Sequence, residues 1–135
     1  MKAIRRWFGA AALLATVAAL GCGDSGPKSY RVSGSVKLGG EPIPYGEVLF
    51  TPDAEQKNAG PQGIAEIHDG KYDTRSAGGK GMPGGPTVIR VNGMSGPGGK
   101  TLCEYELKAD LPRADTTGYD IDVPKNAAAR SGKEI

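Results

Sequence analysis

Apolar residues in this chain recur at every second position, in short runs that end at glycine or proline. The clearest run carries Tyr30, Val32, Gly34, Val36 and Leu38, with polar residues between them. Side chains two positions apart lie on one face of a β-strand, so this spacing predicts strands with one buried face. Twenty glycines and ten prolines fall among residues 22–135, mostly between the runs, which is typical of turns in a β-domain.

Seven runs follow this pattern, and no segment has the 3.6-residue periodicity of an amphipathic helix. The runs cover residues 30–38, 47–51, 63–67, 71–74, 87–92, 102–109 and 119–123. Gly39-Gly40 and Asp69-Gly70 are suited to tight hairpin turns. The sequence therefore predicts an all-β fold, a small seven-stranded antiparallel β-sandwich of the immunoglobulin-like kind, over residues 29–125. A disordered tail is predicted at 126–135.

The first 21 residues differ in character from the rest. Lys2, Arg5 and Arg6 precede an uncharged run of 14 residues, 7–20. This run is too short to span a membrane as a helix, and it matches the apolar region of a secretory signal peptide. Without residues 1–21, 14 of the 17 basic side chains remain against 15 acidic ones. This balance gives no reason to expect nucleic acid as a partner.

The apolar run ends at a cysteine. Ala19-Leu20-Gly21-Cys22 resembles the lipobox of bacterial lipoproteins, in which signal peptidase II cuts before a cysteine that carries lipid. The resemblance implies cleavage after residue 21, acylation of Cys22 by chains such as palmitate, and a flexible tether at 22–28. Gly23, rather than Asp, after the cysteine favours the outer membrane by resemblance to the enterobacterial sorting rule. The alternative is ordinary cleavage nearby, with Cys22 as a free or disulfide-bonded thiol.

Five short motifs carry a second resemblance. They are V-S-G-S-V at 32–36, G-E-P-I at 40–43, G-E-V-L-F at 46–50, D-G-K-Y at 69–72 and G-P-T-V-I-R-V at 85–91. With them the chain resembles the carboxypeptidase regulatory-like, or transthyretin-like, domain over most of residues 29–125. The resemblance implies a β-sandwich and no particular activity, because the motifs are structural. A purine-pathway hydrolase shares this fold, but its closing Tyr-Arg-Gly-Ser motif and its several histidines are missing here.

Few residues suggest chemistry of their own. His68, the only histidine, is expected to be an exposed turn residue with no nucleophile beside it. Cys103 is expected to be a buried structural thiol. Gly79–Gly84 satisfies G-x-G-x-x-G, but a strand rather than a helix is expected after it, so it is interpreted as a loop. Asp120 and Asp122 leave a calcium site open as an alternative to a solvated strand face.

The sequence thus predicts an exported lipoprotein in the cell envelope, held to a membrane through Cys22. We expect no catalytic, cofactor-binding or metal residues, and a binding or structural role with an envelope protein or polysaccharide as partner. Two alternatives remain: an envelope polysaccharide-binding module, and an accessory domain of a secreted hydrolase. Loops and strand edges are the expected contact surfaces.

Overall fold

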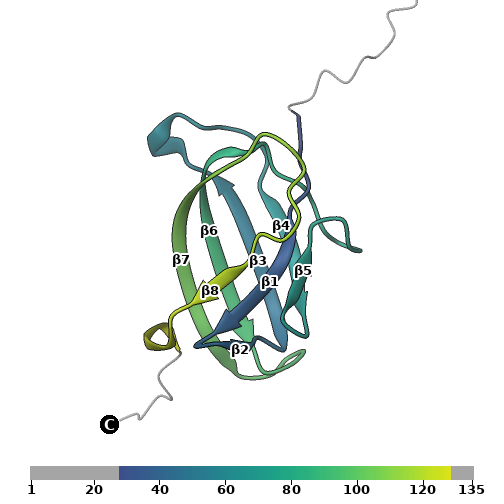
Figure 1. Cartoon of the computed structure of the whole chain (residues 1–135), viewed down its shortest axis with the longest axis vertical. Coiled ribbons are helices and arrows are strands. Elements are labelled where there is room, and N and C mark those ends of the chain that lie inside the picture. Colours follow the sequence, from purple (N-terminus) through teal and green to yellow (C-terminus); the bar gives the residue numbers. More distant parts are fainter. Residues whose placement is uncertain (1–27, 129–135) are drawn as a thin grey trace, which may run out of the picture.

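The computed structural model describes residues 28–128, and the fold within them is all-β, as predicted (Figure 1). Cys22, the predicted leader at 1–21 and residues 129–135 of the predicted tail lie outside the described residues. The strands are β1 (Ser33–Leu38), β2 (Glu41–Pro42), β3 (Tyr45–Pro52), β4 (Gly63–His68), β5 (Lys71–Asp73), β6 (Gly85–Met94), β7 (Thr101–Leu111) and β8 (Ile121–Val123). Two short 3-10 helices complete the described elements, η1 (Ala54–Gln56) and η2 (Lys125–Ala127).

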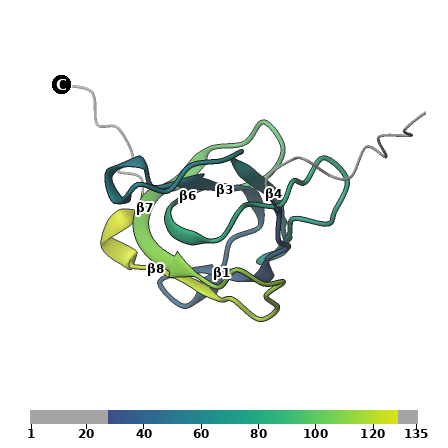
Figure 2. The same cartoon turned by 90° about the horizontal axis from the view of Figure 1, so that it is seen from above.

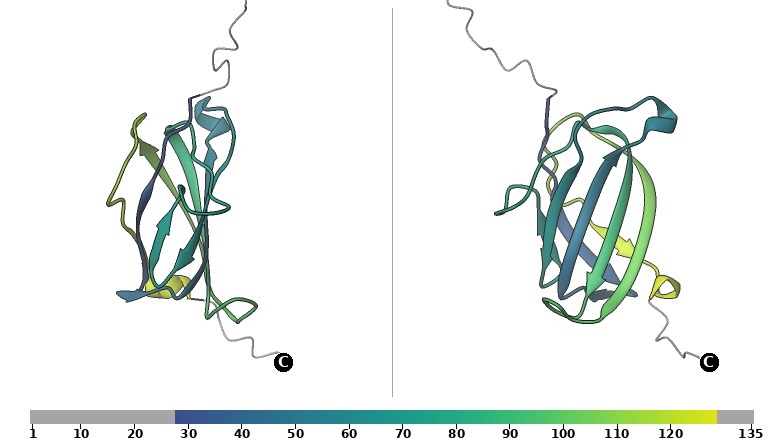
Figure 3. Two further views of the ribbon diagram at one scale, coloured as in Figure 1. Left: turned by 90° about the vertical axis from the view of Figure 1, so that its right-hand side faces the viewer. Right: turned by 180° about the vertical axis from the view of Figure 1, so that it is seen from behind.

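The strands form one sheet in the order β2-β1-β5-β4-β3-β6-β7, and β8 pairs with β1. The sheet curls around an interior, so that β1 and β8 lie opposite β3 and β6 (Figures 2 and 3). Each of the seven predicted runs corresponds to a strand, and the two-residue β2 is an eighth that the sequence analysis missed.

One expectation of strand direction is wrong. β8 runs parallel to β1, with Val36 opposite Ile121, whereas the other strand pairs are antiparallel as predicted. After β7, the chain crosses by residues 112–120 to the end where β1 begins. It therefore enters β8 in the same direction as β1.

Order also extends further toward the C-terminus than predicted. Lys125–Ala127 form η2, and Ala128 makes an antiparallel bridge with Cys103 in β7. The predicted disordered tail therefore does not begin at residue 126, because residues 126–128 are held beside β7.

The core consists of alternate residues from all the longer strands, as the period of two requires. In β3, for example, Gly46, Val48, Phe50 and Pro52 are buried and the residues between them are partly exposed. The fully buried large side chains include Phe50, Ile43, Ile67, Met82 and Ile89. The ring of Phe50 lies 5.9 Å from that of Tyr72, measured between centroids.

The two predicted hairpin turns have the expected backbone. Asp69 and Gly70 have φ of 51° and 74°, and Gly39 and Gly40 have 58° and 88°. Positive φ at both central residues defines the turn whose twist matches paired strands. The turn residues therefore fix the register of β1 with β2 and of β4 with β5.

The connection before β8 is hydrogen-bonded to both β1 and β5 at Tyr119. The Tyr119 amide donates to the Ser33 carbonyl (2.9 Å), and the Tyr72 hydroxyl donates to the Tyr119 carbonyl (2.6 Å). The backbone of Tyr119 fills the place that a side chain at Gly34 would need. Gly34 is therefore required by close packing of two backbones.

We predict that Gly34→Ala lowers the free energy of unfolding by about 2 kcal/mol or more, because the new methyl group overlaps the Tyr119 carbonyl. Gly96→Ala is the matched control, since no atom lies within 4 Å of a methyl group there, and it should change stability by less than about 0.5 kcal/mol. Urea unfolding followed by circular dichroism measures both. Equal stability of the two variants would contradict the close packing at Gly34.

Candidate functional site

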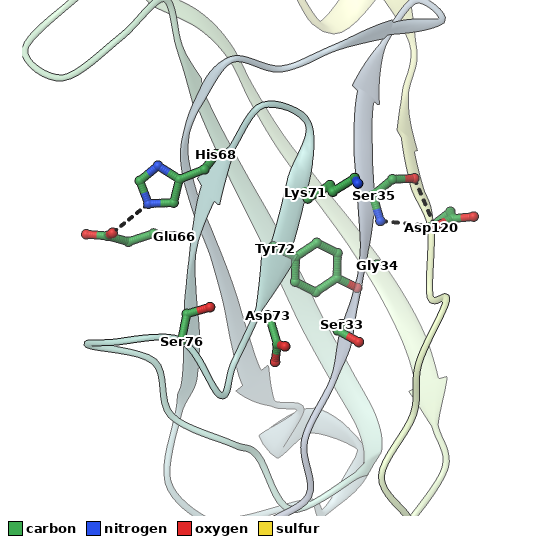
Figure 4. A pocket seen from close by; sticks show the side chains of 10 residues that line it. All are labelled: Ser33, Gly34, Ser35, Glu66, His68, Lys71, Tyr72, Asp73, Ser76 and Asp120. Carbon is green, nitrogen blue, oxygen red and sulfur yellow. Dashed lines mark hydrogen bonds and ion pairs between the residues drawn. The ribbon is translucent and has the colours of Figure 1, made fainter.

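A groove of about 520 Å³ lies on the face of the sheet formed by β1, β4 and β5 (Figure 4). It is lined by Ser33, Gly34, Ser35, Glu66, His68, Lys71, Tyr72, Asp73, Ser76 and Asp120. Seven of these side chains are charged or carry a serine hydroxyl and are at least partly exposed, so polar groups border a groove whose lining is otherwise mostly carbon.

Strand register brings these side chains together. Lys71 lies between His68 on β4 and Ser35 on β1, and Asp73 lies opposite Ser33. Residues two apart on a strand share a face, so these rows form one surface. Gly34 and Tyr72, which are opposite each other, are the intervening residues, and the Tyr72 side chain is buried beneath the groove. Burial raises the pKa of the Tyr72 hydroxyl far above its usual range, so it remains a hydrogen-bond donor to Tyr119.

His68 is exposed, as predicted, but it ends β4 rather than lying within the turn. Its Nε2 lies 3.0 Å from Glu66 Oε2, and its ring meets Tyr45 edge-on with centroids 5.5 Å apart. The imidazole is thus positioned by a carboxylate and an aromatic ring. Within residues 28–128 its hydrogen-bonding partner is not a hydroxyl or thiol that it could activate as a nucleophile.

Asp120 forms the opposite wall of the groove. Its Oδ1 accepts hydrogen bonds from the hydroxyl of Ser35 (2.8 Å) and from the amide of Ser35 (3.0 Å). These two bonds, the hydroxyl first, hold the pKa of Asp120 below its usual value. Asp120 is therefore a fixed, ionised acceptor, and the Ser35 hydroxyl is committed to it.

Three donors in the groove are free of hydrogen bonds within the described residues. They are the Lys71 ammonium and the hydroxyls of Ser33 and Ser76, none of which donates to another described group. Carboxylates at Glu66, Asp73 and Asp120 stand beside them. A ligand with several hydroxyl groups both donates and accepts hydrogen bonds, and this mixture of groups satisfies both needs.

A second hollow, of about 300 Å³, lies between η1 and the outer face of β6 and β7. Beside it, Asp53 Oδ1 accepts from the Glu55 amide, while Asp53 Oδ2 is buried without a hydrogen bond. The Lys108 ammonium lies 3.0 Å from Glu55 and 3.8 Å from Asp53 Oδ2. These carboxylates, the Glu55 hydrogen bond first, raise the pKa of Lys108. Lys108 therefore acts as the counter-ion that holds η1 against β7.

The other residues named from the sequence are dispersed. Cys103 is buried, as predicted, and burial raises the pKa of its thiol. Gly79–Gly84 belong to the connection between β5 and β6, and strand β6 follows at Gly85, as expected. Asp122 lies in β8. Among residues 28–128 no three acidic, histidine or cysteine side chains are grouped to hold a metal ion. In the same part of the chain, no helix has the length and apolar character needed to cross a membrane.

The groove itself was not predicted. Its residues come from segments more than 80 positions apart, and only the register of β1 with β5 and the return of the chain at Asp120 join them. One signal was available in the sequence: Gly34 within a strand marks a close approach of another backbone. That signal points to the crossing segment but does not identify it.

Comparison with protein-family models, with curated proteins and with solved structures finds no match for this chain. The resemblances described above therefore rest on the sequence motifs alone.

We predict that acid weakens the fold partly through Asp120. The unfolded chain takes up a proton at this carboxyl at a higher pH than the folded chain does, because the folded pKa is lowered. Stability from this group is therefore present above about pH 4 and is lost as the pH falls further. Asp120→Asn should lower the free energy of unfolding at pH 7. It should also narrow the difference in that free energy between pH 7 and about pH 3.

Chemical unfolding at both pH values measures this effect. Asp110→Asn is the control, since the described structure shows no hydrogen bond to that exposed carboxylate. Its stability should depend on pH in the same way as that of the parent chain. If both variants keep the acid dependence of the parent chain, the Ser35–Asp120 bonds do not contribute to it.

Proposed function

We propose that this chain is an exported lipoprotein that holds a non-catalytic binding domain at a membrane surface of the cell envelope, with the outer membrane favoured. Signal peptidase II would remove residues 1–21, and Cys22 would carry two or three acyl chains. Several chains hold a protein to a bilayer without a spanning helix, because each buried methylene contributes about 0.8 kcal/mol. The observation that carries the proposal is the cationic start, the short apolar run and the Gly21-Cys22 ending in succession.

For the domain, we propose a transthyretin-like β-sandwich of the carboxypeptidase regulatory-like kind. The support is the order of motifs at 32–36, 40–43, 46–50, 69–72 and 85–91, together with a curled, mainly antiparallel sheet in which β1 and β8 lie opposite β3 and β6. Domains of this kind present binding surfaces on a stable framework.

Binding is favoured over catalysis by the bonds already made in the groove. The Ser35 hydroxyl donates to Asp120, and His68 pairs with Glu66 at an exposed position. A serine nucleophile needs its base within hydrogen-bond reach, and within the described residues none of Ser33, Ser35 and Ser76 is hydrogen-bonded to His68. The groove is thus equipped to contact a ligand without activating it.

An envelope polysaccharide is the second candidate partner, beside an envelope protein. The observation that favours it is the groove's combination of free donors at Lys71, Ser33 and Ser76 with neighbouring carboxylates. Tyr45, beside His68 at the edge of the groove, adds an aromatic ring of the kind that contacts sugar faces.

The anchor is tested by the intact mass of the protein extracted from membranes. We expect a chain that begins at Cys22 and carries two or three acyl chains, and we expect Cys22→Ala to abolish both the acylation and the membrane retention. An unmodified mass, with the protein in the soluble exported fraction, would reject the lipoprotein assignment.

The groove is tested by titrating the chain with soluble oligomers of N-acetylglucosamine while recording amide NMR signals. We expect shifts confined to 33–35, 66–76 and 119–120, and at least severalfold weaker binding for Lys71→Gln, which removes a charged donor. Lys100→Gln, which removes the same charge from the loop between β6 and β7, should bind as the parent chain does. Shifts elsewhere, or equal effects of the two variants, would leave an envelope protein as the proposed partner.

A further inference from the structure

The first described residues, from Lys28 onward, lie on a surface that is rich in basic residues. Three segments meet there, 28–32, 74–85 and 112–118, which we call the tether-side surface. Its charged side chains are five basic and one acidic: Lys28, Arg31, Arg75, Lys80, Arg113 and Asp115. All six residues are exposed. This excess contrasts with the slight acidic excess of residues 22–135 as a whole.

Backbone pairing holds the three segments together. Tyr30 bridges Met82, and Val32 bridges Thr116. The one acidic side chain is already used: Asp115 accepts from the Arg31 amide (2.8 Å) and pairs with Arg75 (3.1 Å). These contacts, the Arg31 amide first, lower the pKa of Asp115, so it stays ionised. Lys28, Lys80 and Arg113 form no ion pair within the described residues.

Neighbouring elements reduce this basic excess without cancelling it. The loop around η1 lies at the same end (Figure 1) and adds Lys57, Asp53 and Glu55, and both acidic side chains face Lys108. Asp73 and Asp110, at the strand ends beside segments 74–85 and 112–118, add two more acidic side chains. The end as a whole therefore has seven basic side chains and five acidic ones. At the opposite end, segments 37–42, 68–71, 95–100 and 122–128 carry four basic residues, Lys37, Lys71, Lys100 and Lys125, and three acidic ones, Glu41, Asp69 and Asp122, besides His68. The basic excess is therefore somewhat larger at the end where the chain enters the domain, and it is greatest on the tether-side surface itself.

We propose that the tether-side surface contacts the anionic lipid headgroups of the membrane to which the domain is tethered. The inference rests on the proposed anchor at Cys22. Only six residue steps separate Cys22 from Lys28, a reach of at most about 20 Å, so an acylated chain keeps this surface within a short distance of the bilayer. Basic side chains near an anionic surface bind it additively, and salt screens the attraction over about 10 Å at 0.1 M.

This contact orients the domain. The groove lies on the outer side of β1, β4 and β5, whereas the tether-side surface lies at the end where the chain enters β1. With the tether-side surface against the headgroups, the strands extend away from the membrane and the groove faces sideways.

Vesicle sedimentation tests the contact without the anchor. The chain from residue 22 onward with Cys22→Ser retains every described strand and lacks the proposed acylation site. We expect it to bind vesicles containing phosphatidylglycerol at low salt, to leave pure phosphatidylcholine vesicles unbound, and to be released by salt. Neutralising Lys28, Lys80 and Arg113 to Gln should weaken binding roughly a hundredfold.

The matched control neutralises Lys37, Lys100 and Lys125 to Gln, which removes the same charge from the opposite end. It should weaken binding by a few-fold at most. Equal losses in the two triple variants, binding to neutral vesicles, or no binding to phosphatidylglycerol would each overturn the proposal. So would binding of heparin at a salt concentration that releases the vesicles, because the surface would then favour an anionic polysaccharide.

Failure of this contact is distinguishable from failure of the anchor. The vesicle experiment uses a chain that cannot be acylated at residue 22, whereas the intact mass of the membrane-extracted parent chain reports acylation directly. If the parent chain is acylated but its Cys22→Ser form does not bind anionic vesicles, the proposed anchor stands and the proposed headgroup contact is rejected.

Discussion

The crossing of residues 116–123 over β1 is the constraint on which the rest of this structure depends. At Gly34 the Tyr119 carbonyl approaches so closely that no side chain fits, and the buried Tyr72 hydroxyl donates to the same carbonyl. One carbonyl thereby links three segments, β1, β5 and the connection that leads into β8. A curled sheet must cover both edges of its interior, and this segment covers the edge at β1. Without it, Val36 and its neighbours in β1 would lose a pairing partner and the core would open on that side.

Both surfaces that we assign to function depend on the same crossing. Asp120, one residue after the crossing point, forms a wall of the groove through its bonds to Ser35. Asp115, just before it, gathers Arg31 and Arg75 at the tether-side surface. The connection between β7 and β8 therefore serves as a scaffold for two sites rather than as a spacer. This explains why a segment with little regular secondary structure makes so many hydrogen bonds to the sheet.

Local rules in the sequence account for most of the strands but for neither site. The period of two located all seven longer strands, and Asp69-Gly70 and Gly39-Gly40 have the backbone that their turns require. The parallel pairing of β8 was missed because alternation reports which face is buried and carries no information on strand direction. The groove was missed for a related reason: Ser33, Lys71 and Asp120 meet only through register and through the crossing. The tether-side surface was missed because Lys28, Lys80 and Arg113 are far apart in the sequence and meet only in the fold.

The arrangement of charge would give the proposed anchor at Cys22 an orienting role. A domain attached by a few residues is free to rotate about its anchor, and an acyl chain alone does not fix which side faces the bilayer. In the proposed arrangement, a basic excess at the point of attachment would make one orientation lower in energy, because every other surface would bring fewer positive charges to the headgroups. The remaining surface is close to neutral or acidic, so the proposed membrane contact would not involve the groove. In this proposed arrangement the crossing at Gly34 holds the fold together, and the fold would leave the groove facing sideways, beside the membrane rather than against it.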